Sequence, residues 1–308
     1  MDMSDLTALG SRQRVFRARK KIQSAGFISH ITQRAAGREP LFVEEGDSLT
    51  FLSLLKEVSA SHDIRFYALC LMPNHVHLLL EPQKDNLSEA MHSIFSRYAR
   101  RFNRKYRRKG HIFGGPYRQA ICLDSCYLLT ASVYIHLNPV RAGLVDRATE
   151  YRWSSCNLYC KEDAPPSFVD PGVVLGLLGD NRRQARRDYA AMISEGKQRQ
   201  PDNALEQEGT IERFLLKLLD VFPSLFKEAA KRGRGRSDSK HDLPDLAEIE
   251  EHLRSLPSGR PRDPETLKAR RYVVEQLLAR GYTRQEVADR LLVSRKTIYN
   301  ILQARLDI

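Results

Sequence analysis

A nine-residue run, Met72–Leu80, constrains the fold more than any other part of this chain. It reads MPNHVHLLL, so two histidines stand two residues apart where an apolar, strand-like stretch begins. Side chains alternate between the two faces of a strand, so His75 and His77 are expected to point the same way. The preceding segment, Arg65–Met72, also has a strand pattern, and the Pro-Asn pair between the two is typical of a turn. The sequence therefore predicts a β-hairpin that presents two imidazoles side by side.

About sixty residues downstream, a second segment adds chemistry to the histidine pair. A helix is predicted there, capped by Asp124 or Ser125 and ended or kinked by Pro139. Tyr134 and Asn138 are four residues apart and so share one face of that helix. Set against the two histidines, they make a tyrosine nucleophile beside a three-ligand metal site. Two plainer interpretations stay open, namely hydrogen-bonded core histidines and an ordinary core tyrosine.

Tyr98, Tyr106 and Tyr127 compete with Tyr134 for the role of nucleophile, and Tyr106 shares the helical pattern of Tyr98. Tyr98 lies in a long helical pattern, 87–109, whose apolar residues recur at steps of three or four, which is typical of a core-facing stripe. Tyr127 opens the same predicted helix as Tyr134, but position 131, four residues later, is alanine and offers no ligand. Tyr134 is therefore the preferred candidate.

At this point the chain resembles a known family. MPNHVHLLL, followed by Tyr-Ile-His-Leu-Asn-Pro-Val-Arg-Ala-Gly-Leu-Val, looks like the REP-associated tyrosine transposases, which are domesticated relatives of the single-tyrosine HUH transposases that move insertion sequences as single-stranded DNA. The likeness extends over roughly residues 12–196 and takes in Phe27–Arg34, Phe113–Ala120 and Tyr151–Ser155. It departs at Pro116, where relatives usually carry a basic residue, and this puts one DNA contact in doubt.

The resemblance implies a mechanism for the predicted site. Tyr134 would attack a phosphodiester, form a phosphotyrosine link to the 5′ side of the cut and leave a free 3′-hydroxyl. His75, His77 and Asn138 would bind the metal. A phenol with a pKa of about 10 is a poor nucleophile at neutral pH, so charge neutralisation at the phosphate is needed and a divalent cation supplies it. Imidazole and amide ligands beside an exchangeable phosphate favour Mg²⁺ or Mn²⁺ over a structural zinc.

The charge of the chain agrees with a DNA partner. Lys and Arg number 50 against 38 Asp and Glu, a net charge of +12. Eight of the thirteen residues in 97–109 are basic, with aromatic residues between them, which is the composition of a helix that follows a phosphate backbone. A solvated charged face is the alternative. The predicted DNA contacts of the catalytic region are Arg97, Arg100, Arg101, Arg104, Lys105 and Arg118.

The C-terminal residues contain a second motif, separate from the histidine and tyrosine segments. Thr283 and Glu286 make a capping-box pattern that opens one helix, and Ser294 caps another that runs to about residue 305. This is similar to a helix-turn-helix whose last helix enters a DNA major groove. A three-helix bundle that binds protein remains the alternative. The outward residues expected to contact duplex DNA are Arg295, Lys296, Thr297, Tyr299 and Asn300.

The order of predicted elements gives the fold class and the domains. Residues 12–160 alternate strands and helices, which favours an α+β fold. The family's ferredoxin-like antiparallel sheet with helices on one side fits this order, and an all-α C-terminal region follows. We expect a catalytic domain over 12–160, its trailing helices over 161–196 and a helical, basic linker region over 197–262. Within that linker, a helix over 211–231 is broken by Pro223 and a short acidic helix lies at 246–256. The helix-turn-helix domain is expected over 263–308.

The composition indicates the redox state of the cysteines and the expected cellular location. The five cysteines sit in apolar or helical segments without the spacing of a zinc knuckle, so they are expected to be reduced core thiols. No signal peptide or membrane-spanning run is visible, so the expected location is the cytoplasm, in association with the nucleoid. The sequence does not decide between a monomer and a homodimer.

Taken together, these features predict a metal-dependent enzyme, a single-stranded-DNA endonuclease and strand transferase that cuts at hairpin sequences. The first alternative is a non-catalytic DNA-binding regulator that keeps the transposase fold. The second is a metal-dependent phosphodiesterase that uses water and in which Tyr134 is structural.

Overall fold

The computed structural model describes residues 15–16, 21–23, 25–37, 39–122, 124–198, 210–234, 270–271, 273–275, 277–278 and 282–303. The predicted acidic helix at 246–256 and residues 263–269 of the expected helix-turn-helix domain lie outside this part of the chain. Within it, no helix combines the length and the apolar character needed to cross a membrane.

A five-stranded antiparallel sheet forms the centre of the region that the sequence predicts to be catalytic. Its order is β1-β5-β2-β4-β3, and each neighbouring pair is antiparallel. The strands are β1 (Val15–Phe16), β2 (Ser29–Arg34), β3 (Ile64–Met72), β4 (His75–Pro82) and β5 (Arg118–Ile121). The hairpin predicted from the MPNHVH run is confirmed, since Met72 pairs with His75 across the two-residue turn.

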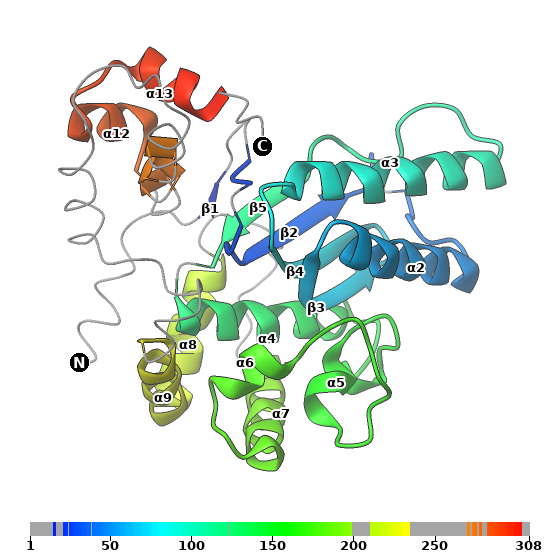
Figure 1. Cartoon of the computed structure of the whole chain (residues 1–308). Coiled ribbons are helices and arrows are strands. Elements are labelled where there is room, and N and C mark those ends of the chain that lie inside the picture. The colour runs from blue at the N-terminus through cyan, green and yellow to red at the C-terminus, as the bar shows by residue number, and fades with distance from the viewer. Residues whose placement is uncertain are drawn as a thin grey trace.

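Two helices pack on one face of the sheet (Figure 1). Helix α2 (Glu45–Ser61) connects β2 to β3, and α3 (Leu87–Lys105) lies between β4 and β5. With β5-β2-β4-β3, they give the ferredoxin-like arrangement, so the predicted α+β class is confirmed. The apolar stripe predicted in α3 is buried against this face and includes Met91, Phe95, Tyr98 and Phe102.

The opposite face of the sheet is covered as well, chiefly by α4 (Ser125–Arg141). The prediction of helices on one side therefore describes α2 and α3 only. The physical reason lies in β4, which is buried at every position: alternate residues such as Leu78 and Leu79 belong to different cores on opposite faces. A strand buried on both faces needs a layer of structure on each side. Asp124 caps α4 by accepting a hydrogen bond from the Tyr127 amide, as predicted.

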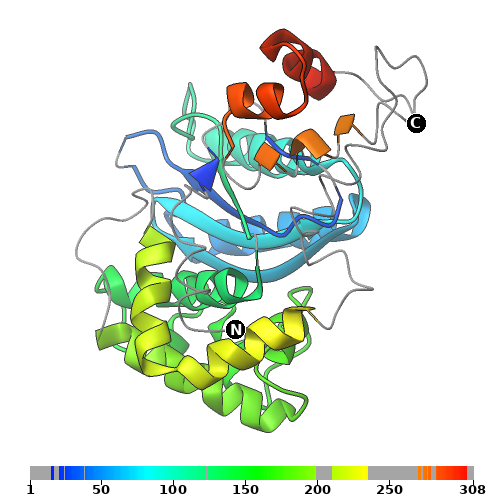
Figure 2. The ribbon, with the colours of Figure 1, turned by 90° about the vertical axis from the view of Figure 1, so that its left-hand side faces the viewer.

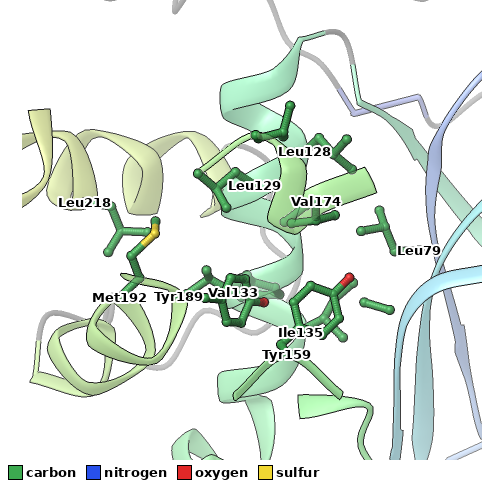
Figure 3. Close-up of a cluster of buried hydrophobic side chains, with 14 of the residues drawn as sticks. Leu79, Leu128, Leu129, Val133, Ile135, Tyr159, Val174, Tyr189, Met192 and Leu218 are labelled. Atoms are coloured by element: carbon green, nitrogen blue, oxygen red, sulfur yellow. The ribbon is translucent and has the colours of Figure 1, made fainter. Parts of the chain in front are cut away.

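Further helices complete the layer around α4. They are the short 3₁₀ turn η2 (Ala148–Glu150), α5 (Cys156–Cys160), α6 (Gly172–Gly176), α7 (Arg182–Gln198), α8 (Thr210–Val221) and α9 (Pro223–Arg234). Figure 3 shows α4 between Leu79 of the sheet on one side and Met192 of α7 and Leu218 of α8 on the other. Pro223 begins α9, and Figure 2 shows the sharp bend between α8 and α9 that the proline was expected to cause. Residues 210–234, assigned from sequence to a linker region, thus contribute to the core around α4.

The C-terminal residues form a small core of their own. Helices α12 (Arg284–Arg290) and α13 (Arg295–Gln303) pack together around Val287, Ala288 and Ile298. The capping box predicted at Thr283 is present, with the Thr283 side chain accepting from the Glu286 amide at 3.2 Å. Ser294 accepts from the amide of Thr297 at 3.0 Å, which confirms the predicted start of the last helix.

Candidate active site

The two histidines of β4 lie on the face covered by α4, with their ring centroids 4.9 Å apart. Each is held through Nδ1. The Nδ1 atom of His75 lies 2.7 Å from Oδ1 of Asn74, and that of His77 lies 2.9 Å from Nε2 of His30 on β2. The Nε2 atoms of both rings are buried and have no hydrogen-bond partner among the described residues. In both rings the contact at Nδ1 therefore fixes the orientation, and Nε2 is left able to bind a ligand.

Asn138 offers a third atom of the same kind. Its Nδ2 donates to the carbonyl oxygens of Tyr134 and Ile135, at 3.0 and 3.4 Å, which fixes the side chain against its own helix. Its Oδ1 is buried and finds no donor in the described part of the structure. A buried polar atom without a hydrogen-bond partner lowers the stability of the fold by about 1–3 kcal/mol. The three such atoms of His75, His77 and Asn138, on the face of the sheet that α4 covers, therefore need an explanation.

These three atoms, two imidazole nitrogens and one amide oxygen, suit a divalent cation in chemical type. No group of three His, Cys, Asp or Glu side chains in the described residues has the arrangement of a metal site. The asparagine is therefore essential to the proposed ligand set. The predicted ligands fit the group that the family resemblance implies.

Tyr134 lies beside the histidines. The centroid of its ring is 6.1 Å from that of His77 and 6.2 Å from that of His30. The side chain is only 3% exposed, and Phe214 of α8 packs against the ring with a centroid distance of 6.4 Å. The rival Tyr98 lies in the core on the opposite face and donates its hydroxyl to the carbonyl oxygen of Leu41.

Arg141 is a site residue that the sequence analysis missed. Its guanidinium lies over the Tyr134 ring, 4.8 Å from the centroid, and its Nη1 is buried without a hydrogen-bond partner among the described residues. Tyr134, Asn138 and Arg141 stand at positions i, i+4 and i+7 of α4. This spacing places all three on one helix face, so the sequence does contain the signal that would have found the arginine.

His30 was also missed, although it lies inside the Phe27–Arg34 segment of the family resemblance. Ile28, directly before β2, and His30 and Thr32 on β2 alternate onto the face that α4 covers. The Thr32 hydroxyl lies 3.4 Å from Nδ1 of His77. The hydrogen bond between His30 and His77 joins two neighbouring strands, β2 and β4, that are far apart in the chain. A pattern of nearby residues therefore cannot predict it.

The electrostatics of the site favour neutral imidazoles. Burial lowers the pKa of His30 to about 4. Burial, and then the charge of Arg34, lower the pKa of His75 to about 4. Burial and the neighbouring rings and arginines hold the pKa of His77 well below its usual value. Neutral imidazole is the form that binds metal, so these rings need lose no proton to do so at neutral pH.

The structure separates the predicted basic helix from Tyr134. Helix α3 packs on the opposite face of the sheet, so its arginines do not lie beside the tyrosine. Arg97 pairs with Glu57 at 2.7 Å, and Lys105 pairs with Glu44 at 2.7 Å and with Asp47, whereas Arg100, Arg101 and Arg104 are exposed. Arg118 differs from these, because it stands opposite Thr32 in the sheet and so shares the face of the histidines.

Comparison with known proteins finds a family match over the segment that holds these residues. Residues 24–138 match the family described as "Transposase IS200 like", a segment that contains His30, both histidines of β4, Tyr134 and Asn138. This segment of the chain is therefore similar to the IS200-like transposases. Over 142 residues it is 27% identical to a protein of Haemophilus influenzae (strain ATCC 51907 / DSM 11121 / KW20 / Rd) that is named as a REP-associated tyrosine transposase, covering 42% of this chain and 80% of that relative. The predicted resemblance to this family is confirmed.

A solved structure is similar as well. It is described as a REP-associated tyrosine transposase bound to a REP hairpin, and its TM-score with this chain is 0.42 at 15% sequence identity. The match covers 52% of this chain and 93% of the other.

Proposed function

We propose that this protein is a single-stranded-DNA endonuclease and strand transferase that cuts through a covalent 5′-phosphotyrosine intermediate. One observation carries the proposal. Three of the atoms that are buried without a hydrogen-bond partner in the described part of the chain belong to residues that a metal-assisted tyrosine transposase would use: Nε2 of His75, Nε2 of His77 and Oδ1 of Asn138. They lie in the layer that also holds Tyr134.

Each residue has a distinct role in the proposed reaction. His75, His77 and Asn138 would bind Mg²⁺ or Mn²⁺, which when bound polarises the scissile phosphate and neutralises its charge. His30 and Asn74 hold the two imidazoles in orientation. The phenol oxygen of Tyr134 attacks phosphorus, so that the Oη–P bond forms while the bond from phosphorus to the 3′-oxygen breaks. The phenol gives up its proton as it attacks, and the departing 3′-oxygen takes up a proton and becomes a hydroxyl, so the step is balanced.

Arg141 would contact the phosphate in this scheme. Its guanidinium stacks on the nucleophile's ring, and its Nη1 has no partner among the residues described. An N–H donor held in a water-poor site stabilises the charge that develops on a phosphoryl oxygen. Its position on α4, one helix turn beyond Asn138, places it at the proposed reaction centre.

A hairpin substrate is the second part of the proposal. The resemblance to the REP-associated tyrosine transposases motivates this choice of substrate. Incubation of the full-length protein with labelled single-stranded hairpins and Mn²⁺, followed by a denaturing gel, should show a protein–DNA adduct. Cleavage without an adduct would favour the hydrolytic alternative. Neither cleavage nor adduct, with hairpin binding intact, would favour a DNA-binding regulator.

The regulator alternative is kept because of one observation, the 3% exposure of Tyr134. A nucleophile must meet its phosphate, so a substrate must displace side chains that cover the ring, Phe214 among them. A protein that only binds hairpins would have no need of this movement. The adduct assay separates the two functions.

The C-terminal helices are proposed to bind duplex DNA. Helices α12 and α13 are short, begin at the side-chain caps Thr283 and Ser294 and pack on each other, and Arg295, Lys296 and Asn300 on α13 are exposed. Such a module would add affinity for duplex beside the hairpin.

A further inference from the structure

Helix α5 brings two cysteine thiols together outside the proposed active site. The Sγ atoms of Cys156 and Cys160 are 3.8 Å apart, and both cysteines are free. Cys156 is fully buried, whereas Cys160 is half-buried. The pair therefore has one thiol that solvent reaches and one directly behind it.

The surroundings make Cys160 the more reactive thiol. A hydrogen bond from Cys156 and the positive charges of Arg186 and Lys161 lower the pKa of Cys160. The Arg186 guanidinium is fixed nearby by donating to the carbonyl oxygen of Leu158. Burial raises the pKa of Cys70, the other thiol close to Cys156, so it stays protonated. Since thiolates rather than thiols are nucleophiles, oxidation should begin at Cys160.

We propose that Cys156 and Cys160 are a thiol pair that hydroperoxides convert to a reversible disulfide. The Cys160 thiolate attacks the peroxide, takes one oxygen to become a sulfenic acid, and releases the other oxygen as hydroxide or alkoxide. The sulfur of Cys156 then attacks the sulfenic sulfur. The S–S bond forms, the S–O bond breaks, and the oxygen leaves as water with the proton of Cys156. A dithiol reductant reverses the step by exchange.

Closing the bridge must open α5. Residues four apart on a helix have Cβ atoms about 5–6 Å apart, whereas a disulfide holds them at about 3.5–4.5 Å. The helix has only five residues, so few backbone hydrogen bonds oppose the change; the one from Lys161 to Asn157, at 3.0 Å, is among them. A short helix therefore accepts a bridge that a long one would resist.

The distortion would reach the helix that carries Tyr134. Ser155 directly precedes Cys156, and its Oγ lies 2.7 Å from Nε2 of His136 on α4 and accepts from the amide of Leu69 on β3 at 2.9 Å. His136 is fully buried and also contacts the Tyr189 hydroxyl at 2.7 Å. The disulfide would therefore displace Ser155 and disturb its hydrogen bond to His136, which lies between Tyr134 and Asn138 on α4. This effect on cleavage rests on the proposed function, whereas the bridge itself does not.

The test is a hydrogen peroxide titration of the full-length protein, read by intact mass and by peptide mapping after alkylation. The expected result is a loss of mass equal to two hydrogen atoms, a peptide that links Cys156 to Cys160, and full reversal by dithiothreitol. Cys156→Ser and Cys160→Ser should each abolish the link, while Cys126→Ser, a buried cysteine of α4, should keep it. Circular dichroism checks that the serine variants fold.

Three outcomes would overturn the proposal. They are free thiols at both positions after peroxide, irreversible addition of two or more oxygens to Cys160, or a link from either cysteine to Cys70. Cleavage is measured in parallel with the same samples. It should fall several-fold on oxidation in the wild type and stay constant in Cys160→Ser. A bridge that leaves wild-type cleavage unchanged would overturn the coupling to α4.

Discussion

The Nε2 atom of His30 lies 2.9 Å from the Nδ1 atom of His77, a contact between two neighbouring strands that leaves the other nitrogen of His77 without a partner in the described structure. Histidines that bind metal through one ring nitrogen commonly have the other held by a hydrogen bond, which fixes the tautomer and the ring orientation. His30 is therefore expected to act on the metal through His77.

Replacing His30 tests this role. His30→Ala should weaken Mn²⁺ binding about 10–100-fold, because His77 loses the contact that orients its ring. Binding is measured by titration calorimetry on the protein without DNA, so the readout does not depend on cleavage. His92→Ala, an exposed histidine of α3 on the opposite face, is the matched control and should bind as the wild type does. Equal affinity in both variants would show that His30 is only a core residue.

Tyr134→Phe removes one hydroxyl and keeps the ring that packs against Arg141 and Phe214. Fold and hairpin affinity should survive, while cleavage and the covalent adduct disappear, because the attacking oxygen is gone. Tyr98→Phe and Tyr127→Phe remove hydroxyls from two of the rival tyrosines and should leave the adduct in place. An adduct in Tyr134→Phe that one of these two variants lacks would transfer the nucleophile's role to that residue.

Arg141 is expected to stabilise the charge on the phosphate. Arg141→Gln should lower the cleavage rate on the order of a hundredfold, the scale at which single donors to a developing oxyanion contribute. Arg141→Lys keeps the charge but loses the planar donor, so its rate should fall between those of Gln and wild type. Single-turnover cleavage at saturating hairpin separates this effect from binding. Equal losses in hairpin affinity and rate would instead indicate a contact to DNA away from the scissile phosphate.

The sequence was sufficient to predict the parts of this site that depend on local spacing. The histidine pair follows from strand alternation, and the Tyr134–Asn138 pair follows from the helix repeat. His30 could not be found in this way, because it is forty-seven residues from His77 in the chain. The two meet only because β2 pairs with β4. The basic run on α3 shows the same limit. The sequence showed that one side of α3 is basic. It could not show on which face of the sheet α3 packs, because that depends on how its apolar stripe meets the folded sheet.

Asp47 should make the structure sensitive to acid. Burial opposes its ionisation, but hydrogen bonds from Lys105, Tyr106 and the backbone amides of Glu44 and Val43 lower the pKa of its carboxyl overall. A group with a lowered folded-state pKa stabilises the fold above its unfolded pKa of about 4, and this stability is lost as the pH falls through the folded value. Stability from urea denaturation should therefore fall below about pH 4. Asp47→Asn should cost about 2 kcal/mol at pH 7, since charge-assisted hydrogen bonds between α2 and α3 are lost, and should flatten the acid dependence. An unchanged slope would assign the acid sensitivity to other groups.

The final prediction separates the two basic surfaces of the protein. Arg295 and Lys296 begin α13 and are exposed, so the full-length double variant Arg295→Ala/Lys296→Ala should lose duplex affinity. The loss should be about 1–3 kcal/mol if either side chain contacts a base edge, and the salt dependence of binding should weaken by about one power for each phosphate contact removed. Arg100→Ala/Arg101→Ala removes the same charge from α3 and is the matched control; it should leave duplex binding near the wild-type value. If duplex affinity at low salt, where phosphate contacts are strongest, is the same in both double variants and in the wild type, then α12 and α13 form a protein-interaction bundle.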